Sequence, residues 1–303
     1  MGRVVPLAAL AAGSPTFVEV LSGWSFSPLP LAVVLLLAVA YLTGVRRLAA
    51  KGRRWAPART ASFMAGCVVV TVALQSGLAA YAASSFSVHV VQHLLLVMLG
   101  PALLALGAPI TLALQAGSRS TQRRLLRVLH CPPAKVVTHP LVAWVLFGGS
   151  MVALYFSGMY AMTLENDYVH DLVHVHFLVV GMLFFWPVVG LDPSVWRMHH
   201  GFRLLYVFVA LPFHAFVGIA LLSGQEPLFA AHTLGDQRAG AGIMWAVGDL
   251  LGLAAVAIVL AQWMAHEKRE SAREDRYADA TRLAAGFAGS AGPEASRAAT
   301  GSS

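Results

Sequence analysis

Residues 88–106 read VHVVQHLLLVMLGPALLAL and contain no Asp, Glu, Lys or Arg. A helix needs about 20 mainly apolar residues to cross the hydrocarbon core of a membrane, so this stretch is long enough for one crossing. Working outward, six further runs of the same kind are bounded by charged residues or by clusters of Pro and Gly. These runs are residues 29–48, 62–83, 141–162, 169–189, 204–222 and 240–264.

The composition of the whole chain agrees with a membrane protein. Of its 303 residues 58% are hydrophobic and 12% are charged, whereas a soluble domain has about 45–50% apolar and about 25% charged residues. This excludes a cytosolic globular enzyme and a disordered protein. The two cysteines, Cys67 and Cys131, are too few for a disulfide-rich scaffold. We therefore expect an all-α, polytopic membrane helix bundle with seven transmembrane helices.

The basic residues predict the orientation of this bundle. With seven spans, 19 of the 21 Lys and Arg fall on one side of the membrane, and only Arg3 and Arg238 fall on the other. Cytoplasmic loops carry the excess of Lys and Arg, which places the N-terminus outside and the C-terminus in the cytoplasm. This topology accounts for the net charge of +7, so we expect no nucleic-acid partner.

The composition also predicts three regions along the chain. Residues 1–23 are expected to form an extracytoplasmic N-terminal arm, and residues 24–266 the seven-helix membrane domain. Residues 267–303 are rich in Ala, Gly and Ser towards their end. Such a segment buries too little apolar surface to fold alone, so we expect a flexible cytoplasmic tail.

Histidines mark a candidate metal site at the predicted outer ends of two spans. His89 and His93 begin the third span, and His170 and His174 begin the fifth. Residues four apart share one face of a helix, so each pair points in one direction. Both pairs lie at the same predicted depth, and four imidazoles converge if the two spans are neighbours.

Four imidazoles with few carboxylates suit copper, zinc or iron, and nearby thioethers favour Cu(I). Met159, Met162 and Met244 lie near the same predicted surface, so copper is the metal that we expect. The alternative is that the histidines form hydrogen bonds between helices. His176 lies about 200° around the helix from His174 and is expected to pack or to support the site.

Two ionisable residues lie deeper in the predicted spans. His214 is near the middle of the sixth span, and Asp249 is within the seventh. Intramembrane ionisable groups are costly and usually have a partner or a function. They either pair with each other or form a relay for protons or cations. His232, in the predicted outer loop between these spans, either caps the metal site or is exposed.

Several motifs occur together in an order that resembles a known family. They are FSVHVVQH at 86–93, LGAPITL at 106–112, the spaced histidines at 170 and 174, GMLFFWP at 181–187, LDP at 191–193 and AGIMW at 241–245. This combination resembles the multi-spanning bacterial CtaG family of cytochrome c oxidase assembly factors, over about residues 24–266.

The resemblance implies a multi-pass protein of the bacterial plasma membrane that helps haem–copper oxidase to mature, through copper supply. It implies cytochrome c oxidase subunits and membrane lipid as partners, and His89, His93, His170 and His174 as the functional histidines. The sequence has no Ser/His/Asp grouping, P-loop or nucleotide-binding motif, so we do not expect an enzyme.

Two other functions remain open from the sequence. A transporter of copper or another cation would use His214 and Asp249 as stations along a path. A b-type haem protein would use one histidine from each of the third and fifth spans as axial ligands.

Overall fold

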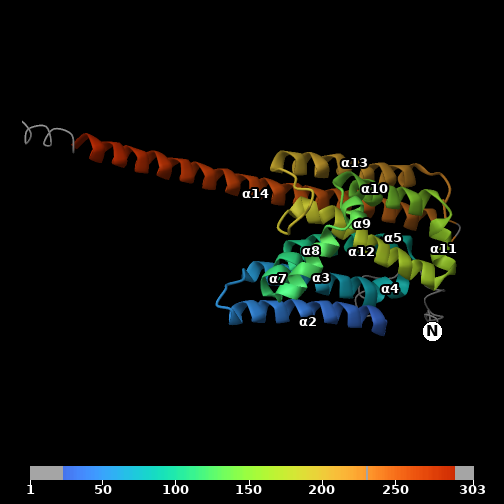
Figure 1. Cartoon of the computed structure of the whole chain (residues 1–303). Coiled ribbons are helices and arrows are strands. Elements are labelled where there is room, and N and C mark those ends of the chain that lie inside the picture. Colours follow the sequence, from blue (N-terminus) through green and yellow to red (C-terminus); the bar gives the residue numbers. More distant parts are fainter. Residues whose placement is uncertain (1–22, 230, 291–303) are drawn as a thin grey trace, which may run out of the picture. The chain divides into compact units, whose positions relative to one another are not determined.

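Every regular element in residues 23–229 and 231–290, the part of the chain that the computed structural model describes, is a helix (Figure 1). The described residues up to Ala257 form one compact unit, and those from Ile258 form another. The helices are α2 Pro28–Ala50, α3 Pro57–Gln75, α4 Gly77–Tyr81, α5 Phe86–Leu94, the π-helix η2 Leu95–Leu99, α6 Gly100–Leu106, α7 Pro109–Ala116, α8 Arg119–Leu129, α9 Pro132–Val137, α10 Pro140–Phe156, α11 Met159–Glu165, α12 Asp167–Val189, α13 His200–Ser223 and α14 Leu234–Ser290.

The helical membrane fold expected from the sequence is confirmed. Within the described residues, six helices are long and apolar enough to cross a membrane, or seven if the pair α10 and α11 is counted as one span. Each of the seven expected spans has a counterpart among them. The orientation of the termini stays a prediction.

The fourth span is not the continuous helix that the sequence suggested. It bends by 70° between Pro140–Phe156 and Met159–Glu165. Ser157 lies at the bend in an extended conformation, with φ −121° and ψ −179°. Its hydroxyl donates to the Ala153 carbonyl and accepts from the Met159 N–H. The side chain therefore replaces backbone hydrogen bonds that the break removes.

The third span is irregular at its centre because of Pro101. A proline has no N–H with which to continue the helical ladder, and the preceding residues form the π-turn η2. The span breaks again at Ala108, whose φ of 50° is left-handed. The following helix α7 packs against α2, where the Tyr41 hydroxyl donates to the Gly107 carbonyl at 2.8 Å.

Gly181 lets α12 approach this irregular region closely. A Cβ added at Gly181 would collide with the carbonyl oxygen of Val97 and lie 2.6 Å from Cγ of Pro101. The glycine therefore sets the distance between α12 and the third span. Gly181 lies seven residues after His174, about 10 Å along the helix, so this contact aligns the two histidine-bearing segments.

Polar side chains close the ends of two helices at the opposite end of the bundle from the histidines. The Asp192 carboxylate accepts from the backbone N–H groups of Ile110 and Thr111, at 3.1 and 2.7 Å, and caps the start of α7. Arg203 is buried and donates to the carbonyls of Val188 and Val189 at the end of α12. These contacts give the motif at 191–193 an architectural role.

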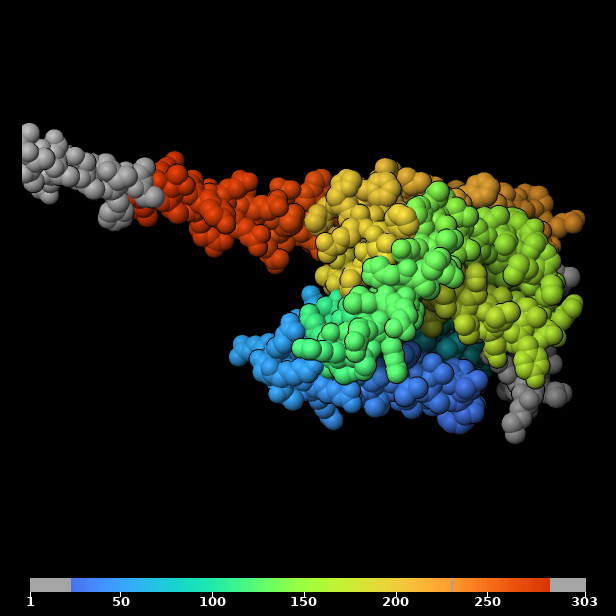
Figure 2. Space-filling model, in the orientation of Figure 1, coloured from blue at the N-terminus to red at the C-terminus, as the bar shows by residue number. Residues whose placement is uncertain are grey.

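The connection between α7 and α10 lies on the surface. The helices α8 and α9 contain no buried residue, and Figure 2 shows this green segment on the outer face. It contains Arg119, Arg123, Arg124, Arg127 and Lys135. A surface segment with this charge suits the predicted cytoplasmic side.

The structure covers the three predicted regions to different extents. The expected arm, residues 1–23, lies outside the described residues except for Gly23. The helix α14 continues to Ser290, well into the expected tail, and residues 267–283 are exposed. The His266 ring lies 3.1 Å from the Glu270 carboxylate, which is a favourable spacing on an exposed helix. Flexibility of residues 267–303 stays a prediction.

Candidate metal centre

The helices α5 and α12 carry the four predicted histidines into one cluster. His89 and His93 lie on the buried face of α5, and His170 and His174 lie on the buried face of α12. At most 4% of each residue is exposed. On α12 the buried positions 170, 173, 174 and 177 follow helical spacing, which explains why both histidines face the bundle interior.

The distances show that the two pairs meet. The ring centroids of His89 and His93 are 3.9 Å apart, and those of His170 and His174 are 4.3 Å apart. Across the two helices, the His89 and His170 rings are 5.6 Å apart, and the His93 and His174 rings are 5.5 Å apart. The four imidazoles predicted to converge are thus neighbours.

Three of these residues have ligand atoms close enough to share one metal ion. One ring nitrogen from each of His89, His93 and His170 lies within 4.8 Å of the other two. Both ring nitrogens of His89 and both of His93 are buried and have no hydrogen-bond partner among the described residues. Buried polar atoms normally have partners, and a metal ion would supply one.

His174 is the buried neighbour of this triad, one turn after His170 on α12. Its Nδ1 lies 4.0 Å from the carboxylate of Asp171, which is exposed. A carboxylate beside a histidine orients the ring and makes its other nitrogen a better ligand. Asp171 is thus placed to support His174.

Aromatic side chains surround the cluster. The Phe177 ring meets the His93 ring edge-on at 4.8 Å, and the Tyr160 ring meets the His89 ring perpendicularly at 4.8 Å. Phe86 stacks on His89 at 6.4 Å. These rings separate the imidazoles from water, which favours the neutral form that binds metals.

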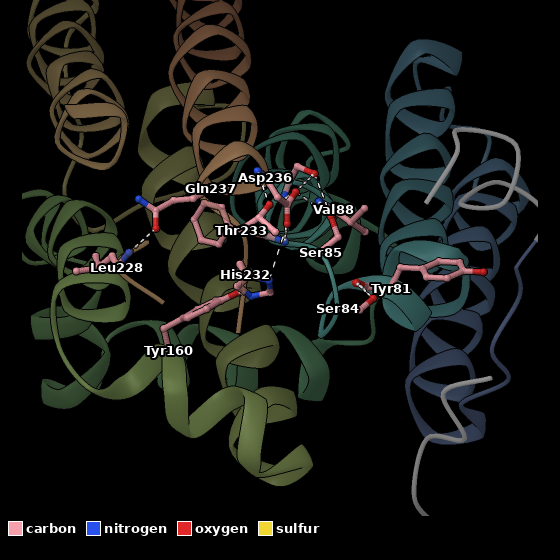
Figure 3. A network of polar contacts seen from close by, with 12 residues as sticks. Tyr81, Ser84, Ser85, Val88, Tyr160, Leu228, His232, Thr233, Asp236 and Gln237 are labelled. Atoms are coloured by element: carbon pink, nitrogen blue, oxygen red, sulfur yellow. Dashed lines mark hydrogen bonds and ion pairs between the residues drawn. The ribbon is translucent and has the colours of Figure 1, made fainter. Parts of the chain in front are cut away.

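A polar network joins this aromatic shell to the start of α14 (Figure 3). The Tyr160 hydroxyl is 2.8 Å from Nε2 of His232, and Nδ1 of His232 is 3.8 Å from the Asp236 carboxylate. Asp236 also accepts from the backbone N–H groups of Phe86 and Ser87, at 2.6 and 3.2 Å. Asp236 therefore fixes the N-terminus of α5, one turn before His89.

His232 is buried in the loop between α13 and α14, beside the aromatic shell. Burial lowers its pKa, and the neighbouring Asp236 opposes this shift. Of the two alternatives from the sequence, an exposed His232 is therefore wrong. The residue caps the aromatic rings that cover the cluster.

Of the other residues considered from the sequence, His176, Met159 and Met162 lie outside the buried group. His176 is on the opposite, exposed face of α12, and its Nε2 is 2.7 Å from the Ser150 hydroxyl. Met159 and Met162 are 41% and 53% exposed, so neither belongs to the buried group. Met244 is buried on α14.

One alternative from the sequence was that His214 and Asp249 pair with each other. One side-chain atom of each residue makes no such hydrogen bond. Nε2 of His214 and Oδ1 of Asp249 are both without a hydrogen-bond partner in the described part of the chain. His214 packs where a Cβ at Gly248 would lie 2.7 Å from its Cδ2. Asp249 is one residue further along α14 and is half-buried.

Tyr160 and Asp236, which support the site, were not singled out from the sequence, and Gly181 was noted only as part of the motif at 181–187. For Asp236, the available signal was a carboxylate at the start of the last span, on the same predicted side as the Ser85-Phe86-Ser87 helix start. Carboxylates are stabilising near helix N-termini. Nothing in the local sequence pairs these two segments.

The sequence profile of the cytochrome c oxidase caa3 assembly factor family matches residues 39–266. This range contains all four clustered histidines.

Uncharacterised mycobacterial proteins are also similar to this chain. Mb0105 of Mycobacterium bovis and MT0111 of Mycobacterium tuberculosis are each 34% identical to it over 283 residues, and ML1998 of Mycobacterium leprae is 32% identical over 285 residues. The matches cover 88% of this chain but 43% of each relative. The chain therefore spans less than half the length of these relatives. No solved structure matches it.

Proposed function

Since the chain belongs to the cytochrome c oxidase caa3 assembly factor family, we propose that it binds copper and supplies it to the oxidase. The ligands are His89, His93, His170 and His174. The role is binding and release, without catalysis, in the bacterial plasma membrane.

The observation that supports this proposal best is the buried group of three ring nitrogens within 4.8 Å of one another. Metal–nitrogen bonds of about 2.0 Å in a tetrahedral site place neighbouring nitrogens about 3.3 Å apart. Small rotations of the imidazole rings are enough to close the remaining gap. The aromatic neighbours leave His89 and His93 without other hydrogen-bond partners, so metal binding satisfies atoms whose burial is otherwise costly.

The nature of the ligands favours release as well as binding. Imidazoles bind copper, zinc and iron, and the cluster holds no thiolate that would retain a soft metal permanently. Copper is the cargo that the family's oxidase implies. Protonation of an imidazole competes with the metal and promotes release.

The proposed orientation places this cluster on the extracytoplasmic side. Exposed carboxylates of Glu165, Asp167 and Asp171 lie at the same end of the bundle, where they attract cations. The basic segments lie at the other end of the helices, as cytoplasmic segments do.

The functional test is complementation in cells that lack the chromosomal copy of this gene. We expect the wild-type protein to restore the copper content and activity of the oxidase, and His93→Ala to fail at the same membrane abundance. His176→Ala is the matched control, because it removes an imidazole from the opposite face of α12. Full restoration by His93→Ala would reject the proposed copper supply.

Transport is the competing function, and His214 is the observation in its favour. Its ring is buried in the middle of α13 with an unpartnered Nε2. Proteoliposomes separate the two functions: the supply role predicts that copper binds at the outer face without accumulating inside. Copper uptake that Asp249→Asn abolishes would establish transport instead.

A further inference from the structure

A cavity lies at the end of the bundle away from the histidine cluster. It has a volume of about 850 Å³, which is within the usual range of ligand pockets. The start of α10, the start of α13 and the loop that precedes α13 line it, and it is open to the outside. Its lining residues are His139, Pro140, Leu141, Trp144, Ser194, Val195, Trp196, Arg197, Met198, His199, Phe202, Leu205, Tyr206 and Val209.

The walls of this cavity form an apolar groove between two membrane helices. On α13, Phe202, Leu205 and Val209 follow helical spacing and are 45%, 54% and 45% exposed. On α10, Leu141 is 63% exposed, and Trp144 closes the groove by meeting Phe213 edge-on at 4.8 Å. The groove thus runs from the helix ends along the part of the helices that lies in hydrocarbon.

The mouth of the groove is basic. Arg197 lines it together with His139 and His199, and its lining contains no Asp or Glu. The Trp196 indole donates to the Lys135 carbonyl at 2.9 Å, which holds the backbone of a second basic residue beside the lining residue Trp196. The His139 ring meets the Trp196 ring edge-on at 4.6 Å and fixes this wall.

From this combination we propose that the groove binds one anionic phospholipid. The acyl chains lie against α10 and α13, and the phosphate headgroup lies beside Arg197. An apolar groove with a cationic end matches a molecule that has an apolar tail and an anionic head. The basic segments place this end at the cytoplasmic leaflet, where anionic lipids attract basic residues near the membrane surface.

The test is lipid binding to the purified, delipidated full-length chain, followed by native mass spectrometry. Phosphatidylglycerol and phosphatidylcholine with identical acyl chains are the two probes, because they share the apolar tail and the phosphate but have an anionic and a zwitterionic headgroup, respectively. We expect one phosphatidylglycerol to bind in preference to phosphatidylcholine. A basic residue near a membrane surface contributes about 1 kcal/mol, so Arg197→Ser should reduce this preference about fivefold.

Two further variants distinguish the groove from general surface charge. Arg124→Ser removes an exposed arginine of α8 that does not line the cavity, and it should leave the preference unchanged. Leu205→Trp enlarges an exposed side chain on the wall and should remove the bound lipid without unfolding the chain.

The proposal is overturned if neither lipid is preferred, or if Arg124→Ser acts as strongly as Arg197→Ser. It is also overturned if lipid still binds to Leu205→Trp, or if inorganic phosphate displaces the lipid completely, which would indicate a site for a free anion. A dimer that Leu205→Trp dissociates would assign the groove to a second copy of the chain.

Discussion

Replacement of Asp236 by alanine should destabilise the start of the histidine-bearing helix α5. The carboxylate is 9% exposed and accepts hydrogen bonds from two backbone N–H groups and from the hydroxyls of Ser85 and Ser87. Loss of an N-cap costs about 0.5–2 kcal/mol, and a hydrogen bond to a charged group contributes about 1.5–3 kcal/mol. Because Ser85 and Ser87 can rearrange, we expect a total loss of about 2–3 kcal/mol.

Thermal unfolding in detergent measures this loss. The free, buried thiol of Cys67 becomes reactive when the bundle opens, so a thiol-reactive dye reports the transition. At about 2–4 °C per kcal/mol, Asp236→Ala should lower Tm by about 4–12 °C. Asp236→Asn keeps one carbonyl acceptor for the helix start and should lower Tm by about half as much.

Glu226→Gln is the control, because it removes an exposed carboxylate from the neighbouring loop. It should change Tm by less than about 1 °C, as exposed substitutions usually do. If Asp236→Ala unfolds at the wild-type temperature, the carboxylate does not hold α5 in the way that its four hydrogen bonds imply.

Three further outcomes follow from the packing and the charges. Gly181→Ala should destabilise the bundle by about 1–3 kcal/mol by overpacking against Val97. Gly149 has open space around it, so the control Gly149→Ala should be neutral or stabilising. Equal Tm values for the two variants would contradict the close contact at Gly181. Burial raises the pKa of the Asp192 carboxyl, so the folded protein favours its protonated form. The resulting contribution to the free energy of unfolding is full below about pH 4 and is lost as the pH rises through the raised pKa. The Tm of the wild type relative to Asp192→Asn should therefore fall as the pH rises above about 4, and a constant difference would show that the carboxyl is not perturbed. His176→Ala should keep the full metal stoichiometry, and a loss of metal would place the site on the wrong face of α12.

The membrane fold could be predicted because its signals are local. Apolar runs, their polar boundaries and the spacing of His170 and His174 depend only on neighbouring residues in the sequence. Helical periodicity then indicates that each histidine pair shares one face. The same reasoning placed His176 away from the cluster, which the structure confirms.

Features that depend on two distant segments could not be predicted in this way. The close contact of Gly181 with Val97 requires knowledge of which helices are neighbours, and so does the cap that Asp236 forms on α5. The break at Ser157-Gly158 could not be told from the sequence, because the similar run Gly148-Gly149-Ser150 in the same span continues as helix. For the same reason, the sequence predicted that the two histidine pairs converge only if the third and fifth spans are neighbours.

The most direct test of the copper-binding proposal is the metal content of the purified protein after copper loading, together with its visible absorption spectrum. The comparison protein is the variant in which His89, His93, His170 and His174 are all replaced by alanine. We predict about one copper per wild-type chain, no copper in the variant at an unchanged helical content, and no haem Soret band in either protein. Equal copper in both folded proteins would contradict the site, and a Soret band lost with the histidines would identify a haem protein instead.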